Sequence, residues 1–136
     1  MTDETKTMHV MLVEPGKYAE MVDIERTLAA EQAAVGGYVE FVRLEEGVTL
    51  IVNEEGKLNG MRPNRLLTDD DGEVIDIIHG PFLVCGEEWT EDGIVTTDLP
   101  QEAERKYQEQ FHDIQLIDPQ RQRVFVIHDE APPFQY

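Results

Sequence analysis

Polar and apolar residues alternate over much of this chain, and that alternation indicates β-strands with one buried face. It is clearest in YVEFVRL at 38–44, where Val39, Phe41 and Arg43 share one side. A Glu-Glu-Gly turn follows, and the continuous apolar run VTLIVN at 48–53 comes next. The two segments therefore predict an antiparallel hairpin.

The same reasoning predicts further strands outside this hairpin. The segment at 18–24 alternates as an exposed strand should, and 74–86 is either one strand or two short ones broken at His79–Gly80–Pro81. The polar residues at 68–73 and the acidic residues around the only Trp, at 87–93, predict loops. The further predicted strands lie at 9–15, 18–24, 74–86 and 121–129.

Two segments have the composition of helices. Residues 25–37 combine high helix propensity with a Gly-Gly stop, and we expect Leu28, Gln32 and Val35 to share one face. The second helix is predicted to begin after an N-cap at Asp98 and to end near Phe111. Its apolar residues recur every four positions, which predicts one face in the core. They are Leu99, Ala103, Tyr107 and Phe111.

Strands outnumber helices in this pattern, which predicts an α+β fold with a mostly antiparallel sheet and two helices. A chain of 136 residues suits a single domain. We place that domain at 1–130 and interpret 131–136 as a flexible C-terminal tail. No apolar run is long enough to span a bilayer, and the polar N-terminus does not resemble a signal peptide. A cytoplasmic location is therefore expected.

The formal charge of −18 excludes whole classes of partner. Direct nucleic-acid binding requires cations that displace phosphate counterions, and anionic membranes would repel this surface. Two interpretations of the acidity stay open at this point. The carboxylates either keep the protein soluble or imitate nucleic acid on a basic partner protein.

The few cations are unevenly distributed. Between Leu44 and Glu104 the only Lys or Arg residues fall inside one turn rich in glycine and asparagine. Glycine permits close backbone approach, amides donate and accept hydrogen bonds, and arginine binds phosphate or carboxylate through two donors. These are the components of an anion-binding site, although a hairpin turn whose cations pair with nearby carboxylates has the same composition. The candidate ligand-binding residues are Asn53, Gly56, Lys57, Arg62, Asn64, Arg65, His79 and Gly80.

No catalytic or metal-binding pattern stands out. Serine is absent from the chain, and the single Cys85 lies in an apolar segment without basic neighbours. The histidines lack the spacing of a helical metal site, and DDDG at 69–72 lacks the other ligands of a calcium loop. We therefore expect a protein that is not an enzyme and holds no cofactor or metal.

Four segments carry a resemblance to a known family. The chain resembles a small group of uncharacterised proteins, known only as a domain of unknown function, that phages, plasmids and integrative elements of Gram-positive bacteria carry. The resemblance extends from 13 to about 111, and the strand at 121–129 lies beyond it. The segments are VEPGK at 13–17, GGYVE at 36–40, VNEEGKLNGMRPNRLL at 52–67 and DIIHGPFLVCG at 76–86.

This resemblance implies a role in counter-defence inside the host cytoplasm. In that setting we favour a protein that sequesters a small anionic ligand of the nucleotide type through the 53–65 turn. Replacing Lys57 and Arg65 with Ala should then abolish binding and leave the fold intact. The alternative is an acidic mimic of nucleic acid that binds a basic host protein, such as a nuclease or restriction complex. A homodimer is compatible with either function.

Overall fold

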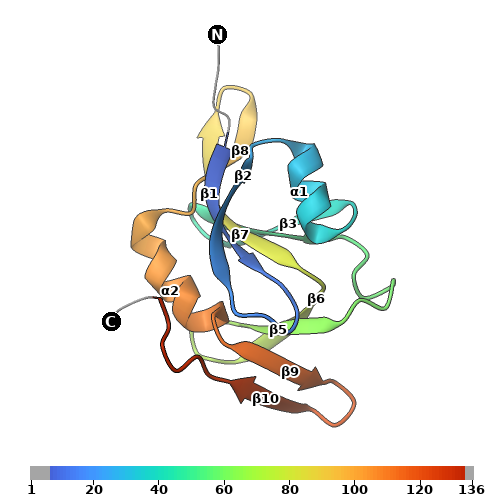
Figure 1. Ribbon diagram of the computed structural model, residues 1–136. Coiled ribbons are helices and arrows are strands. Elements are labelled where there is room, and N and C mark those ends of the chain that lie inside the picture. The colour runs from blue at the N-terminus through green and yellow to red at the C-terminus, as the bar shows by residue number, and fades with distance from the viewer. Residues whose placement is uncertain (1–6, 134–136) are drawn as a thin grey trace.

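The computed structural model describes residues 7–133 (Figure 1). Along the chain the elements follow in the order β1-β2-α1-β3-β4-β5-β6-β7-β8-α2-β9-β10. The predicted α+β class is confirmed. The helices are α1 (Leu28–Val35) and α2 (Gln101–Phe111). The strands are β1 (Thr7–Val13), β2 (Glu20–Glu25), β3 (Val39–Glu45), β4 (Val48–Asn53), β5 (Pro63–Thr68), β6 (Val74–His79), β7 (Phe82–Thr90), β8 (Gly93–Thr97), β9 (Ile114–Asp118) and β10 (Arg123–Ile127).

A twisted antiparallel sheet forms the body of the molecule. Its strand order is β2-β1-β7-β4-β3, and β8 pairs with the C-terminal half of the long strand β7. Two separate hairpins, β5–β6 and β9–β10, pack beneath it. The backbone N–H of Leu66 donates to the side-chain oxygen of Gln115 at 2.9 Å, which joins β5 to β9.

Alternation along the central strands gives the sheet two apolar faces. Helix α2 and the β5–β6 hairpin cover one face, where Phe111 and Phe82 meet edge to face at 5.2 Å. Helix α1 packs on the other face through Val35. The two helices therefore lie on opposite sides of the sheet (Figure 1). The second face carries Met8, Val10, Ile51, Leu83 and Cys85.

The ends of α1 follow from local sequence. Thr27 accepts a hydrogen bond from the N–H of Ala30 at 3.1 Å, and Gly36 ends the helix in the left-handed conformation with φ 81°. The predicted helix is thus confirmed over Leu28–Val35, and of the three residues expected to share one face only Val35 is fully buried. Leu28 is 56% exposed, whereas Glu31 is only 5% exposed. A helix of eight residues makes too few turns for composition to identify its inner side.

Helix α2 ends at Phe111 as predicted, but its predicted N-cap is wrong. Pro100 precedes the first helical residue, and no side chain caps the helix. The carboxylate of Asp98 instead accepts a hydrogen bond from the backbone N–H of His9 at 2.7 Å. Asp98 is therefore bonded to a residue of β1, and not to the first turn of α2 as the capping pattern predicts.

Several strands were not recognisable in the sequence. The acidic segment expected as a loop at 87–93 belongs to a β-hairpin, in which Trp89 of β7 pairs with Ile94 of β8. Strands β5 and β9 were also missed, because polar residues interrupt their apolar pattern. The segment at 74–86 resolves into the two strands β6 and β7, and β10 pairs with β9. Residues 134–136 of the expected C-terminal tail lie outside the described part of the chain.

Candidate functional site

The cation-rich turn links two different sheets and is not a hairpin. It leaves β4, which pairs with β3 and β7, and enters β5, which pairs with β6. The polypeptide therefore crosses from the main sheet to the β5–β6 hairpin within this segment. That crossing brings several of the eight candidate residues into the protein interior.

Arg65 and Asn64 lie at the centre of this crossing, and both side chains are 0% exposed. The guanidinium of Arg65 donates to the carbonyl oxygens of Phe111 at 2.9 Å and Lys17 at 2.7 Å, and to the side-chain oxygen of Asn64 at 2.8 Å. The amide of Asn64 donates to the carbonyl oxygens of Val13 and Gly80, both at 2.9 Å. These donors fasten β5 to β1, to β6 and to the end of α2.

Asn53, Gly56 and Gly80 shape the same crossing. The amide of Asn53 donates to the carbonyl oxygen of Val35 at 3.1 Å, and its oxygen accepts from the N–H of Glu55 at 2.8 Å. A Cβ at Gly56 would lie 2.8 Å from the carbonyl oxygen of His79. Gly80 has φ 80° and donates its N–H to the carbonyl oxygen of Arg62 at 2.8 Å. Each residue has a contact within the protein that accounts for its type.

Four of the eight candidates, Asn53, Gly56, Lys57 and His79, line one pocket of about 370 Å³ between β3–β4 and β6. The ammonium of Lys57 lies 2.5 Å from the carboxylate of Asp76. Glu40 and Glu54 also line this pocket, so its carboxylates outnumber its cations. Exposed Arg62 packs elsewhere, beside Gly16. The structure therefore does not bring the eight residues into one cationic site, and anion binding by the turn stays a prediction.

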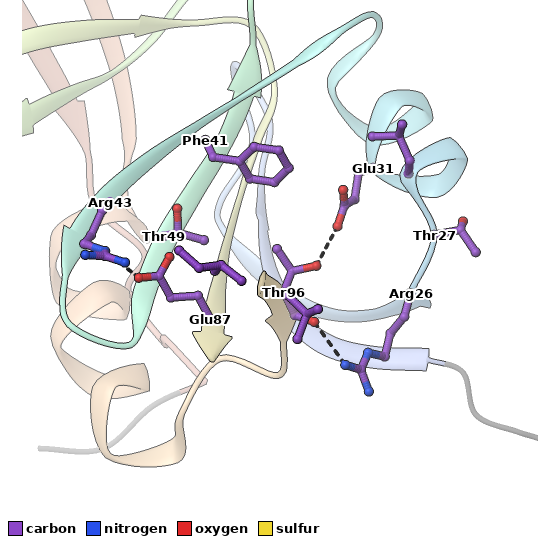
Figure 2. A pocket seen from close by; sticks show the side chains of 11 residues that line it. Arg26, Thr27, Glu31, Phe41, Arg43, Thr49, Glu87 and Thr96 are labelled. Atoms are coloured by element: carbon purple, nitrogen blue, oxygen red, sulfur yellow. Dashed lines mark hydrogen bonds and ion pairs between the residues drawn. The ribbon is translucent and has the colours of Figure 1, made fainter. Parts of the chain in front are cut away.

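The largest cavity described lies on the opposite side of the sheet, and we name it the α1-side cleft. Helix α1 is short and covers only part of its sheet face, which leaves the part between β3 and β8 open. The opening has a volume of about 1020 Å³. Figure 2 shows Arg43 and Glu87 on one side and Arg26, Thr27 and Glu31 on the other. The lining residues are Arg26, Thr27, Leu28, Glu31, Phe41, Arg43, Thr49, Glu87, Ile94, Val95 and Thr96.

The charged residues of the cleft are held in defined positions. Arg43 donates to the carboxylate of Glu87 at 2.5 Å, and its guanidinium lies 5.9 Å from the ring centre of Trp89. Arg26 donates to the carbonyl oxygen of Thr96 at 3.2 Å. Arg26 is exposed, and this one contact leaves further N–H groups of its guanidinium directed to solvent.

Large apolar side chains are exposed around the same opening. Phe41 is 53% exposed and Ile94 is 46% exposed, both within the cleft lining. Trp89, which pairs with Ile94 across the β7–β8 hairpin, is 73% exposed. Uncovered aromatic groups next to arginine are typical of binding surfaces. The cleft is thus a described site where cations and open apolar surface occur together.

Glu31 forms the inner wall of the cleft beneath Thr96, whose hydroxyl donates to its carboxylate at 2.8 Å. Burial raises the pKa of Glu31, and the hydrogen bond from Thr96 opposes that shift only in part. For a carboxyl group with a raised folded-state pKa, stability is greatest below the unfolded-state pKa and is lost as pH rises through the folded-state value. The buried charge therefore weakens the fold at neutral pH.

We expect Glu31→Gln to raise the free energy of unfolding at pH 7 by about 1 kcal/mol, because a neutral amide keeps an acceptor for Thr96 without a buried charge. The gain should shrink as pH falls through the folded-state pKa and disappear below the unfolded-state pKa. Urea unfolding at a series of pH values measures it. Exposed Glu88→Gln is the control, since it removes the same charge from the surface of an acidic protein. Equal gains in both variants would contradict the burial argument.

Sequence reasoning missed this cleft for an identifiable reason. It placed Phe41 and Arg43 on one side of a strand, but it interpreted 87–93 as a loop, so Glu87 and Trp89 were not assigned to the same face. The pairing of β7 with β8 brings them together. Cys85, Glu87 and Trp89 lie at alternate positions, and this spacing is the sequence signal for a strand that places their side chains on one face.

Comparison with known proteins adds a family and no function. A family model described as a domain of unknown function (DUF3846) matches residues 8–112. No curated protein and no solved structure matches the chain significantly. Within residues 7–133 no group of His, Cys, Asp or Glu is placed to hold a metal ion. The described helices are also too short or too polar to cross a membrane.

Proposed function

We propose that this chain, which belongs to the DUF3846 family, is a non-enzymatic binding protein that holds a small anionic ligand of the nucleotide type in the α1-side cleft. The observation that carries the proposal is the open sheet face on which Arg26, Arg43 and Phe41 occur together. The 53–65 turn is replaced as the proposed site, because Arg65 and Asn64 are buried and Lys57 is paired with Asp76.

Charge supports an anionic ligand at this position. In a protein of net charge −18, an anion needs a place where the local carboxylates are already neutralised. In the cleft, the carboxylate of Glu87 is paired with Arg43. The guanidinium of Arg26 stands at the rim with donors available for a phosphate or carboxylate oxygen.

Aromatic surface supports a ligand that also has a flat apolar part. The ring of Phe41 lies on the sheet side of the opening (Figure 2), and Trp89 lies beyond Arg43. Bases stack on aromatic rings and on guanidinium planes with little dependence on sequence. The hydroxyl of Thr27 accepts from the N–H of Ala30, and its own proton can be donated to a polar group of a ribose or base.

The residues that line the α1-side cleft favour a binding function over a catalytic one. The described wall contains no His, Cys, Lys or Tyr side chain to serve as base or nucleophile. Glu31 has a raised pKa, but it is 5% exposed and bonded to Thr96, which keeps its carboxylate from a ligand. Together with the expected setting in a mobile element, this arrangement suits a cytoplasmic counter-defence protein that removes a signal by binding it.

Thermal unfolding in the presence of candidate ligands tests the proposal. The panel contains inorganic phosphate, mono-, di- and cyclic nucleotides, and cyclised ADP-ribose. A ligand at about a thousand times its Kd adds about 4 kcal/mol to stability. We expect Arg26→Ala to weaken binding by about tenfold to a hundredfold, because one charge-assisted contact is lost.

Arg62→Ala is the matched control, since Arg62 is also an exposed arginine but lies in the 53–65 turn. It should bind as the wild type does. Loss of binding in Arg62→Ala with retention in Arg26→Ala would return the site to the turn. A panel without any shift would contradict nucleotide binding at either place.

A second candidate function rests on the pocket that contains Lys57. Glu40, Glu54 and Asp76 surround an apolar floor there, which suits a basic side chain of a partner protein. This is the acidic mimic of nucleic acid, directed at a basic host defence protein. Glu40→Gln combined with Glu54→Gln would weaken such a complex and leave nucleotide binding in the α1-side cleft unchanged.

A further inference from the structure

The β9–β10 hairpin extends the fold beyond the matched family domain. The family match ends at residue 112, and the hairpin occupies Ile114 to Ile127. Figure 1 shows it at the edge of the molecule, with β10 on the outside. Its inner strand β9 contacts β5. Strand β10 pairs with β9 alone among the described strands, so its other edge is unpaired.

The β9–β10 hairpin exposes several apolar side chains to solvent. Register pairs Phe125 with Leu116, so these two side chains share one face, and Ile127 follows Phe125 on that face. Phe125 is 65% exposed, Leu116 40% and Ile127 43%. Val126, on the other face, is 46% exposed. An unpaired edge next to exposed apolar residues is the usual template for strand addition.

Local charge identifies which partner this edge suits. The chain as a whole carries −18 and repels its own copies. Residues 119–127 are an exception, because they contain Arg121 and Arg123 and no Asp or Glu. Asp118 lies opposite Arg123 on β9 and is paired with Arg121 at 3.0 Å, so strand β10 itself presents no carboxylate to a second acidic copy. The end of the hairpin is therefore suited to self-association.

We propose that β10 is the contact surface for a second copy of this chain. Two β10 strands pair antiparallel across a two-fold axis at Phe125, and the two hairpins become one continuous sheet. This arrangement satisfies the free backbone groups of both edges and covers Phe125 with its own counterpart. It also places the two Arg123 side chains at opposite ends of the strand pair, so that they do not repel each other.

Sedimentation equilibrium of the whole protein tests this contact. We expect a mass of twice the 15.6 kDa of the chain at high protein concentration. Dimerisation should strengthen as salt rises from about 0.05 M to about 0.5 M, because salt screens the repulsion between acidic bodies and leaves apolar contact intact. A monomer at about 0.1 mM protein in high salt would overturn the proposal, since a specific interface has a lower Kd.

Phe125→Asp is expected to raise the dimer Kd at least tenfold, because it places two carboxylates at the axis. Leu58→Asp is the control: Leu58 is an exposed apolar residue at 86%, but it lies in the 53–65 turn. This control should associate as the wild type does. A dimer that survives Phe125→Asp, or is lost in Leu58→Asp, places the interface elsewhere.

A cross-linking variant makes the test independent of any effect of Asp on folding. The single native Cys85 is buried, so an introduced thiol is the one that reacts. Under mild oxidation, Phe125→Cys should form a disulfide-linked dimer on a non-reducing gel, because the axis brings the two thiols together. Leu58→Cys should stay monomeric on the gel. Equal cross-linking of the two variants would overturn the proposed axis.

Discussion

Replacing Arg65 with Ala is expected to lower the free energy of unfolding by about 4 kcal/mol. The side chain is 0% exposed and donates to oxygens from three parts of the chain, at Phe111, Lys17 and Asn64. Ala would leave those oxygens without a donor in a region closed to water, and it would leave a cavity. Burial lowers the pKa of Arg65 to about 10, so the side chain is still charged at neutral pH.

Urea unfolding at pH 7 measures this loss, and two further variants define its cause. Exposed Arg62→Ala removes the same side chain three residues earlier and should change stability by less than about 0.5 kcal/mol. Arg65→Lys keeps the charge but cannot reach the same set of oxygens, so it should recover only a minor part of the loss. A stable Arg65→Ala protein would contradict the structural role of this residue.

The buried position of Arg65 explains why cations gather in a turn of this acidic protein. One of the three fastens β5 to its neighbours, one pairs with Asp76, and one is exposed beside Gly16. Composition identified the segment as unusual, and that was correct. It could not identify the cause, because a buried arginine bonded to carbonyl oxygens and an anion-binding arginine have the same local sequence.

Local patterns predicted the elements whose sequence signal is continuous. The β3–β4 hairpin, helix α1 with its Gly36 end and the apolar side of α2 all follow from residues close together in the chain. The pairing of β7 with β8 does not, because a Trp among acidic residues resembles a solvated loop. Since that pairing forms one wall of the α1-side cleft, the site could not be predicted without the tertiary structure.

The cleft also depends on what α1 leaves uncovered. Helix α1 contributes only its N-terminal end to the lining, at Thr27, Leu28 and Glu31, and it ends at Gly36 after eight residues. The C-terminal end of the helix is readable from the Gly36–Gly37 stop, but its start at Leu28 and the width of the sheet beside it are not. An open face therefore results from a local signal combined with a long-range pairing.

Gly86 lies at the point of β7 where β4 and β8 both pair with it. Gly86→Ala is expected to lower the free energy of unfolding by about 3 kcal/mol. Gly86 pairs with both Val48 of β4 and Thr97 of β8. A Cβ there would lie 2.2 Å from the carbonyl oxygen of Asp98, which belongs to the backbone and cannot move aside by rotating. The β8 strand would have to shift away from β7.

Gly72→Ala separates this clash from ordinary glycine strain. Gly72 has φ 82°, and a Cβ added there would meet open space, so Ala at this position should lower stability by only about 1 kcal/mol. Adding Thr97→Ala to Gly86→Ala should not restore stability, because the backbone oxygen of Asp98 stays in place. Trp89, the only Trp, lies three residues beyond Gly86 and reports the displaced hairpin by fluorescence. If Gly86→Ala unfolds like the wild type and Trp89 emission is unchanged, the close crossing at Asp98 is wrong, and with it the wall of the cleft that β8 supplies.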